Sequence, residues 1–186
     1  EYGKSITDAC IGWSESMESG WTRWTLDQHQ LRYDTVKDTR MRAGNLRRDY
    51  DVILIQTHSP SALRNGQSAN RYPAEYAGGL GSAGTEALKQ FVLDGGRLIT
   101  IEESTDFAID LFGLGVRSAV EGLRNTEFYV PGPILSVDLE TSHPINRGMT
   151  PKTAVWFCDA SRAFDVSDAR VRVLALVLGT AQAPAC

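Results

Sequence analysis

Apolar runs bounded by turn residues recur along the chain, and segments of helical periodicity lie between them. The clearest run is DVILIQ (51–56), a continuous, largely β-branched stretch of the kind found in strands that are covered on both faces. RLITI (97–101) is a second run of this kind. Between them, residues 82–94 place their large apolar side chains on one helical face, and the Gly95-Gly96 pair marks the end of that helix.

Other segments continue this alternation of strands and helices. We expect strands at 8–13, 134–140, 153–157 and 171–178, and helices at 20–30 and 105–112. Such alternation indicates a mainly parallel central sheet with helices on both faces, which is a three-layer α/β sandwich. A length of 186 residues fits one domain over 1–186. Trp13, Trp21 and Trp24 are interpreted as core or interface anchors.

Composition narrows the class of protein and its partners. Hydrophobic residues make up 42% of the chain and charged residues 23%, as in ordinary globular proteins. The formal net charge of -4 argues against a general nucleic-acid or membrane-surface binder, and no apolar run approaches the roughly 20 residues that cross a bilayer. A basic cluster of Arg40, Arg42, Arg47 and Arg48 is interrupted by apolar residues and is interpreted as a solvated face. We therefore expect no nucleic acid and no membrane as partners.

The cysteines indicate neither a metal site nor a disulfide framework. Cys10, Cys158 and Cys186 lie far apart and match no C-x-x-C pattern. Cys10 and Cys158 stand in apolar runs and are interpreted as buried small hydrophobic side chains. We expect no metal and no cofactor. The chain opens with Glu1 rather than Met, so we expect a processed chain or a piece of a larger one.

The stretch GGLGSAG (78–84) contains a G-x-G-x-x-G spacing that includes Gly79 and Gly81. A dinucleotide-binding fingerprint needs its first glycine directly after a strand, whereas here the preceding strand ends at Gln56, more than 20 residues earlier. We interpret the stretch as a loop that enters a helix capped by Ser82. Its free N–H groups could still bind an anion.

Several longer strings carry a resemblance to a known family. They are SMESGWTRWTLDQHQ, MRAGNLRRDYDVILIQ, PAEYAGGLGSAGTEALKQFVLDGGRLITIEESTDFAI and SHPINRGM. Together they resemble the class I glutamine amidotransferase-like domain at the C-terminal end of bacterial zinc carboxypeptidase-like proteins, from about Gly12 to Val177. The resemblance implies a flavodoxin-like α/β sandwich that is secreted or periplasmic. It also implies a zinc carboxypeptidase-like domain of the same parent chain as the partner.

The zinc hydrolase chemistry of such proteins is absent from this sequence. Zinc carboxypeptidases bind their metal through a His with a Glu three residues later, and neither His29, His58 nor His143 has a Glu at that spacing. His143 stands directly before Pro144 and is interpreted as a turn residue. This chain is therefore not expected to be the zinc peptidase itself.

The turn after RLITI corresponds to the nucleophile position of active class I amidotransferases. Those enzymes place a Cys on a sharp turn between a central strand and a helix, whose N-terminus lowers the pKa of the thiol. Here the turn reads ITIEESTDF and puts Glu102 at that position, with Glu103 and Ser104 beside it. We expect Glu102 to have a tight, strained backbone and its carboxylate to point into a cleft. Hydrolysis of glutamine by a thiolate is not expected.

The chemistry of this turn has alternatives. Ser104 is either a nucleophile with His58 as its base or the N-cap of the helix at 105–112. Glu102 and Glu103 either form a general acid–base pair or complement the helix dipole.

The carboxyl ends of neighbouring parallel strands meet at one edge of a sheet, where ligands bind. We expect a pocket there, lined by the residues after 51–56, the residues after 97–101 and the loop 78–81. The candidate ligand-binding residues are Thr57, Ser59, Gly79, Gly81 and Glu103, and the catalytic candidates are Glu102, Ser104 and His58.

Two functions follow from these expectations. The first is a non-catalytic accessory domain, without the nucleophilic Cys of the family, that packs on a peptidase partner or binds a small ligand or peptide. The alternative is a small ester or amide hydrolase that uses Ser104 or Glu102 with His58.

Overall fold

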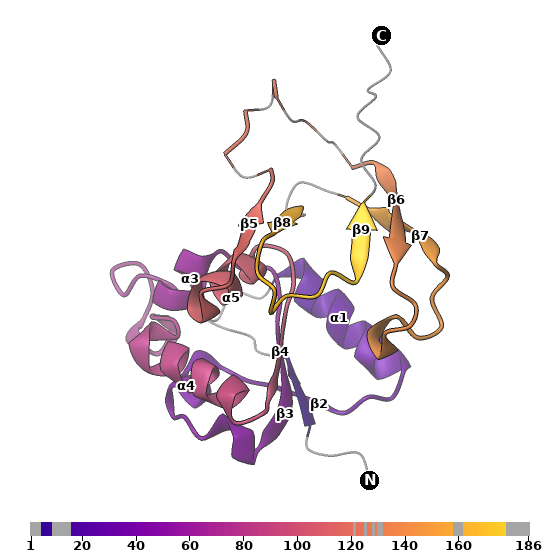
Figure 1. The fold of residues 1–186 in the computed structure, drawn as a ribbon. Coiled ribbons are helices and arrows are strands. Elements are labelled where there is room, and N and C mark those ends of the chain that lie inside the picture. Colours follow the sequence, from indigo (N-terminus) through magenta and orange to yellow (C-terminus); the bar gives the residue numbers. More distant parts are fainter. Residues whose placement is uncertain are drawn as a thin grey trace. The chain divides into compact units, whose positions relative to one another are not determined.

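The computed structural model describes residues 5–8, 16–120, 122–124, 126–127, 129, 132–157 and 162–177. It divides into two compact units, Glu1–Gly113 (unit 1) and Leu114–Cys186 (unit 2), whose elements are labelled in Figure 1. The organisation of 1–186 as one domain stays a prediction. Within the described ranges, no helix has the length and apolar character needed to cross a membrane.

Unit 1 contains a four-stranded sheet in which each neighbouring pair of strands is parallel. The strand order is β2-β1-β3-β4. The strands are β1 (Ser5–Asp8), β2 (Tyr33–Thr35), β3 (Tyr50–Ile55) and β4 (Arg97–Thr100). The strands predicted at 51–56 and 97–101 are confirmed as β3 and β4. Of the strand predicted at 8–13, only Asp8 is described, and it is the last residue of β1.

Five α-helices and two 3-10 turns are described in unit 1. They are α1 (Met17–Gln28), α2 (Asp38–Arg42), η1 (Leu46–Arg48), α3 (Pro60–Asn65), η2 (Ala74–Tyr76), α4 (Gly81–Leu93) and α5 (Ser104–Phe112). Figure 1 shows α3, α4 and α5 to one side of the strands and α1 to the other. The predicted end of α4 is confirmed, because the N–H groups of Gly95 and Gly96 turn back to the carbonyl groups of Val92 and Phe91, at 3.0 and 2.9 Å.

The core of unit 1 lies between the sheet and the helices α2 to α5. β3 contributes Ile53 and Ile55, which lie on the same face because side chains alternate along a strand. α4 and α5 contribute aromatic and aliphatic side chains to the same cluster. The buried cluster consists of Val36, Met41, Leu46, Tyr50, Ile53, Ile55, Leu63, Leu80, Leu88, Phe91 and Phe107. Each large member stabilises the folded state by about 1.5–3 kcal/mol through burial.

Helix α1 carries exposed aromatic side chains. Trp21 and Trp24 are 64% and 55% exposed and touch each other edge to face, with ring centroids 5.9 Å apart. Neither is a core residue, so that part of the prediction is wrong: both side chains are more than half exposed, and α1 contributes no residue to the buried cluster. Their role as interface anchors stays a prediction. Trp13 and the three cysteines lie outside the described residues.

Unit 2 is built from antiparallel pairs. β5 (Val116–Ser118) pairs with β8 (Phe164–Val166), and a three-stranded sheet has the order β7-β6-β9. Its strands are β6 (Ile134–Leu139), β7 (Lys152–Trp156) and β9 (Ala175–Val177). The strand predicted at 171–178 is therefore reduced to three residues. Parallel pairing among the described residues is confined to unit 1, so the chain is mixed α/β with small sheets.

A polar loop follows β6 in unit 2. His143 caps the 3-10 turn η3 (Pro144–Asn146), and its Nδ1 accepts the N–H of Ile145 at 3.3 Å. This is the turn role predicted for His143. The buried side chain of Asn146 donates to the carbonyl oxygens of Glu140 and Leu174, at 3.1 and 3.0 Å. The amide thus joins the end of β6 to the segment before β9.

Candidate functional site at the carboxyl edge of the parallel sheet

Thr57 and Glu102 bring together the ends of two neighbouring strands. Ile55 at the end of β3 pairs with Thr100 at the end of β4, and the N–H of Ile101 extends the ladder to the carbonyl of Ile55 at 3.0 Å. One step further, Thr57 Oγ1 donates to Glu102 Oε2 at 2.6 Å. The prediction that these two segments lie at the same edge of the sheet is confirmed.

Glu102 occupies a left-handed backbone conformation, with φ of +55°. A non-glycine residue costs roughly 1–2 kcal/mol in this region because its Cβ approaches the following carbonyl oxygen. The conformation turns the chain sharply from β4 into α5, and the first turn closes with Thr105 N–H donating to Glu102 O at 3.0 Å. The strained backbone predicted for Glu102 is confirmed. This backbone conformation and the hydrogen bond from Thr57 hold the carboxylate of Glu102 at the edge of the sheet.

Ser104 is fully buried, and backbone groups occupy its hydroxyl. The oxygen accepts the N–H of Ile101 at 2.9 Å, and its proton is shared with the carbonyl oxygens of Ile101 and Ile55, at 2.8 and 3.0 Å. Ser104 is the first residue of α5, and Glu103 stands at the cap position without a side-chain cap bond. The N-cap prediction for Ser104 is therefore wrong. The nucleophile–base pair of Ser104 and His58 stays a prediction; in this structure the hydroxyl is buried and bonded to the two strand ends.

His58 is half-buried directly after Thr57. Burial lowers its pKa below the ordinary value of 6.5, and the charge of Glu18 in the first turn of α1 raises it to a smaller extent. The imidazole is therefore neutral at pH 7. Its electrostatic neighbour is the start of α1 and not the hydroxyl of Ser104.

Ser59 and Glu103 belong to the same edge and have clear local roles. Ser59 is the N-cap of α3, where its hydroxyl accepts the N–H of Ala62 at 3.2 Å and Pro60 takes the first helical position. Glu103 is half-buried at the cap position of α5, where its negative charge complements the helix dipole. The roles of both residues in ligand binding stay predictions.

The loop 78–81 is packed against the end of α3. Leu80 N–H donates to Leu63 O at 2.9 Å, and a Cβ on Gly79 would lie 2.7 Å from the same carbonyl oxygen. Glycine is required there by this close backbone approach. Arg42 donates to the carbonyl oxygen of Gly79. Among the described residues, no hydrogen bond joins this loop to the Thr57–Glu102 pair.

The start of α4 corrects a second cap prediction. The helix begins at Gly81, with φ of +58°, and the residue before it, Leu80, has no side chain that could cap. Ser82 lies inside the first turn and is not the N-cap. The ligand-binding roles of Gly79 and Gly81 stay predictions.

Sequence reasoning missed Gln56, the residue between β3 and Thr57. Its side chain is 1% exposed, and neither Oε1 nor Nε2 has a hydrogen-bond partner in the part of the chain that the structure describes. The sequence carries no signal for this, because a glutamine at the end of an apolar run is equally compatible with an exposed side chain.

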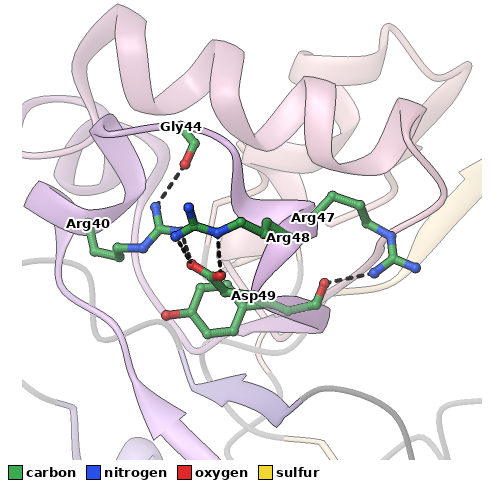
Figure 2. A network of polar contacts seen from close by, with 6 residues as sticks. Arg40, Gly44, Arg47, Arg48 and Asp49 are labelled. Atoms are coloured by element: carbon green, nitrogen blue, oxygen red, sulfur yellow. Dashed lines mark hydrogen bonds and ion pairs between the residues drawn. The ribbon is translucent and has the colours of Figure 1, made fainter.

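The arginines of the basic cluster are partly exposed, and each is paired with a carboxylate: Arg40 and Arg48 with Asp49, Arg42 with Asp38 and Arg47 with Asp51. Figure 2 shows the guanidinium groups of Arg40 and Arg48 on the carboxylate of Asp49, at 2.6 and 2.8 Å. Arg40 also donates to Gly44 O at 2.8 Å, and Arg47 to the carbonyl of Tyr50 at 3.0 Å. The hydrogen bonds from Arg48 and Arg40 hold the pKa of Asp49 well below its usual range. The cluster is thus paired within unit 1.

Two further features concern ligands. A hollow of about 360 Å³ lies on β6 and β7 of unit 2 and is lined by Ile134, Leu135, Ser136, Lys152, Thr153 and Ala154. It contains none of the predicted site residues. Among the described residues, no group of three or more His, Cys, Asp or Glu side chains is placed to hold a metal ion.

Comparisons with solved structures give weak similarity, while comparisons with protein families and curated proteins give none. Neither a protein-family model nor a curated protein matches the chain. The solved structure of a GMP synthase subunit from Thermoplasma acidophilum aligns with a TM-score of 0.48 and 14% identity. The alignment covers 86% of this chain and 66% of that protein, so this chain spans slightly less than two thirds of its length.

Proposed function

We propose that this chain is a non-catalytic accessory domain that binds a small ligand at the carboxyl edge of its parallel sheet. The proposal includes the flavodoxin-like, three-layer arrangement of a class I amidotransferase-like domain, with Glu102 in place of the nucleophile. It is supported by the strand order β2-β1-β3-β4, which is the order of the first four strands in flavodoxin-like sheets. In such sheets, ligands bind outside the carboxyl ends of the strands.

The observation that carries the proposal is the pair of Thr57 and Glu102. A strained backbone and a 2.6 Å hydrogen bond fix a carboxylate at the turn between a strand and a helix. Strained conformations persist where the surrounding structure over-determines them, and they concentrate at ligand and active sites. A fixed carboxylate is a poor acyl acceptor, but it binds an ammonium group well. We therefore propose that the ligand carries a primary amine.

The wider context of the domain is proposed from the sequence resemblance alone. It comprises a zinc carboxypeptidase-like domain of the same parent chain as partner and a secreted or periplasmic location. The exposed pair of Trp21 and Trp24 is compatible with packing on such a partner. Sequencing of the gene upstream of the codon for Glu1 tests this directly, because a chain without an upstream peptidase domain would contradict the context.

The ligand site is tested by Glu102→Gln. We expect isopropylammonium chloride to shift the backbone amide resonances of Thr57 and Glu102 saturably in the wild type. Glu102→Gln should fold normally and lose this response, because the charge is removed while the shape is kept. Glu86→Gln, on the exposed side of α4, is the matched control and should bind like the wild type. Equal responses of Glu102→Gln and the wild type, or no saturable response of the wild type, would overturn the proposal.

The hydrolase alternative now rests on Glu102 and His58, because the hydroxyl of Ser104 is engaged with backbone. We expect Ser104→Ala to lower the free energy of unfolding by about 1 kcal/mol through its lost hydrogen bonds. Hydrolysis of p-nitrophenyl acetate should be no faster with the wild type than with Ser104→Ala. Saturable wild-type turnover that disappears in Ser104→Ala or in Glu102→Gln would establish the hydrolase and overturn the accessory role.

A further inference from the structure

Strand β7 forms one edge of the three-stranded sheet in unit 2. Among the described residues it pairs with β6 alone, and β9 forms the other edge. An edge strand presents a row of backbone N–H and C=O groups that can pair with another strand, and proline, bulges or several charges usually protect it. Within β7, Lys152 is the one charged residue, and there is neither a proline nor a bulge. The strand is therefore open to pairing.

The hydrogen bonds at the two ends of the β6–β7 pair show which backbone groups point to this edge. Pro151 O accepts the N–H of Leu139 at 2.7 Å, and the N–H of Phe157 donates to Pro133 O at 3.0 Å. In an antiparallel pair, residues that bond to the partner strand alternate with residues whose N–H and C=O point away from it. The residues of β7 that point away from β6 are therefore Lys152, Ala154 and Trp156. The carbonyl oxygen of Lys152 already accepts the hydroxyl of Thr150, and it has a second lone pair.

The side chains of these three residues lie on one face of the sheet, because side chains alternate along a strand. Trp156 is 72% exposed, and its indole N–H donates to Gly132 O at 3.0 Å, so the ring is held in place. The ammonium group of Lys152 lies 3.8 Å from a carboxylate oxygen of Asp138. Ala154, between them, is exposed and has the smallest side chain of the strand. The row thus consists of a paired cation, a small central residue and a fixed aromatic ring.

This row is complementary to a second copy of itself in antiparallel orientation. When two β7 strands pair about a two-fold axis at Ala154, each Lys152 stands opposite Trp156 of the other copy. The N–H and C=O groups of Ala154 then bond reciprocally across the axis, and those of Lys152 and Trp156 bond on either side of it. A lysine opposite a tryptophan is a favourable cation–π combination. On the other face, Thr153 stands opposite Val155, and both side chains are β-branched.

Charge and shape favour this register over the other symmetric ones. A pairing centred at Lys152 would place two ammonium groups directly opposite each other, which is destabilising. A pairing centred at Trp156 would extend past the strand, which ends at that residue. The register at Ala154 also places Trp156 of one copy beside the hollow of about 360 Å³ in the other, because Lys152 and Ala154 line that hollow.

We infer that β7 is a homodimerisation edge, at which two copies of this chain pair as antiparallel strands about Ala154. The pairing uses the same edge of both copies, so the assembly closes at two chains. Each copy contributes a strand of five residues, which is a small interface, so the dimer is reversible. The inference concerns unit 2 and does not depend on the ligand site proposed for unit 1.

The mass of the full chain as a function of concentration tests the inference. In sedimentation equilibrium, the mean mass should rise from near that of one chain, 20.4 kDa, toward twice that value between about 1 µM and about 1 mM, as for a small, transient interface. Over the same range, hydrogen exchange at the N–H of Ala154 should slow, because that group becomes bonded in the dimer. A mass that stays at one chain at about 1 mM, or that grows beyond two chains, would overturn the inference.

Matched proline substitutions distinguish the two edges of the sheet. Ala154→Pro removes an N–H that points away from β6, so the thermal midpoint should stay close to that of the wild type. Association should be at least about tenfold weaker, because each copy loses a central hydrogen bond. Ala175→Pro is the control: the N–H of Glu140 donates to Leu174 O at 3.0 Å, so Ala175 points away from β6 at the outer edge of β9. Equal association of Ala154→Pro and the wild type, or equal weakening in Ala175→Pro, would contradict pairing through β7.

Charges at residue 154 test the register. A side chain on the two-fold axis faces its own copy, so Ala154→Lys and Ala154→Glu should each associate at least about tenfold more weakly than the wild type, because like charges then stand opposite each other. Ala154 is exposed, so both variants should fold. An equal mixture of the two should regain the dimer, because opposite charges then meet at the axis. A mixture that associates no better than either variant alone would refute an axis at Ala154.

Discussion

Units 1 and 2 both contain strands drawn from apolar runs, but they bury those runs to very different extents. In unit 1, Ile53 and Ile55 of β3 are fully buried and belong to one cluster with α4 and α5. Among the described residues of unit 2, Val137 is the one large hydrophobic residue whose side chain is buried. Ile134 and Trp156, from paired strands of the same sheet, are 74% and 72% exposed. An apolar run therefore forms a buried strand in unit 1 and a largely exposed strand in unit 2.

The difference shows what an apolar run specifies. It specifies a strand, because β-branched and aromatic residues fit an extended, pleated backbone. Burial additionally requires a second layer, which unit 1 supplies with helices between its parallel strands. The described residues of unit 2 are held together by antiparallel ladders, by exposed ion pairs such as Arg172 with Glu140, and by the amide of Asn146. Exposed ion pairs contribute little, so the amide is expected to matter more.

The largest expected effect contrasts the same substitution in both units. Leu88→Ala in α4 removes a fully buried side chain from the core of unit 1 and should lower the free energy of unfolding by about 2–5 kcal/mol, measured by chemical denaturation. Leu176→Ala in β9 removes a side chain that is 52% exposed and should change it by less than about 0.5 kcal/mol. Equal losses in the two variants would show that unit 2 is as well buried as unit 1.

The sequence predicts the long elements of unit 1 well, for physical reasons that are local. In α4, the helical periodicity and the Gly-Gly stop are carried by neighbouring residues, and the observed helix ends at Leu93, one residue before the predicted end at Asp94. The short strands β2, β5 and β8 have three residues each and no apolar run, so their pairing depends on partners that are distant in sequence. Antiparallel register in unit 2 is likewise a long-range property that no single run encodes.

The candidate site could be predicted only in outline. The rule that parallel strand ends meet at one edge brought Thr57 and Glu102 together correctly. It could not place Ser104, because the left-handed turn at Glu102 starts α5 one residue before the expected helix and directs the hydroxyl to the strand ends. It also could not reveal the unsatisfied amide of Gln56, because hydrogen-bond satisfaction depends on the whole surrounding structure.

A smaller effect tests the polar tie in unit 2. Asn146→Ala removes two hydrogen bonds from a buried amide and leaves two carbonyl oxygens with fewer donors. We expect a loss of about 1–3 kcal/mol in the stability of unit 2. It should appear as faster hydrogen exchange at the N–H of Glu140, which donates to Leu174 O. The exposed Asn70→Ala is the control and should leave this exchange unchanged. Unchanged exchange in Asn146→Ala would mean that the ladders alone hold the sheet.

The smallest expected effect uses pH to separate burial in unit 1 from the exposed ion pairs of unit 2. Burial lowers the pKa of His58, so the unfolded chain takes up its proton at about pH 6.5 and the folded chain only at lower pH. The unfolded state therefore binds more protons in this range, and the contribution of His58 to stability, complete above about pH 6.5, is lost as pH falls through the folded pKa. In unit 2, hydrogen bonds from Arg172 and Arg170 lower the pKa values of Glu140 and Asp168. These carboxylates therefore stay ionised while the pH falls from about 6.5, the ordinary pKa of histidine, through the range in which His58 titrates.

His58→Gln should flatten the fall in unfolding free energy between about pH 6.5 and pH 5, measured by denaturation at closely spaced pH values. Glu18→Gln is the matched partner variant. It removes the charge that raises the pKa of His58, so it should move that pKa further down and extend the loss of stability to lower pH. The variants are compared by the slope of the unfolding free energy against pH, because each substitution also changes that free energy by an amount that does not depend on pH. A slope that is the same in the wild type and in His58→Gln would show that the imidazole is as solvated in the folded chain as in the unfolded one.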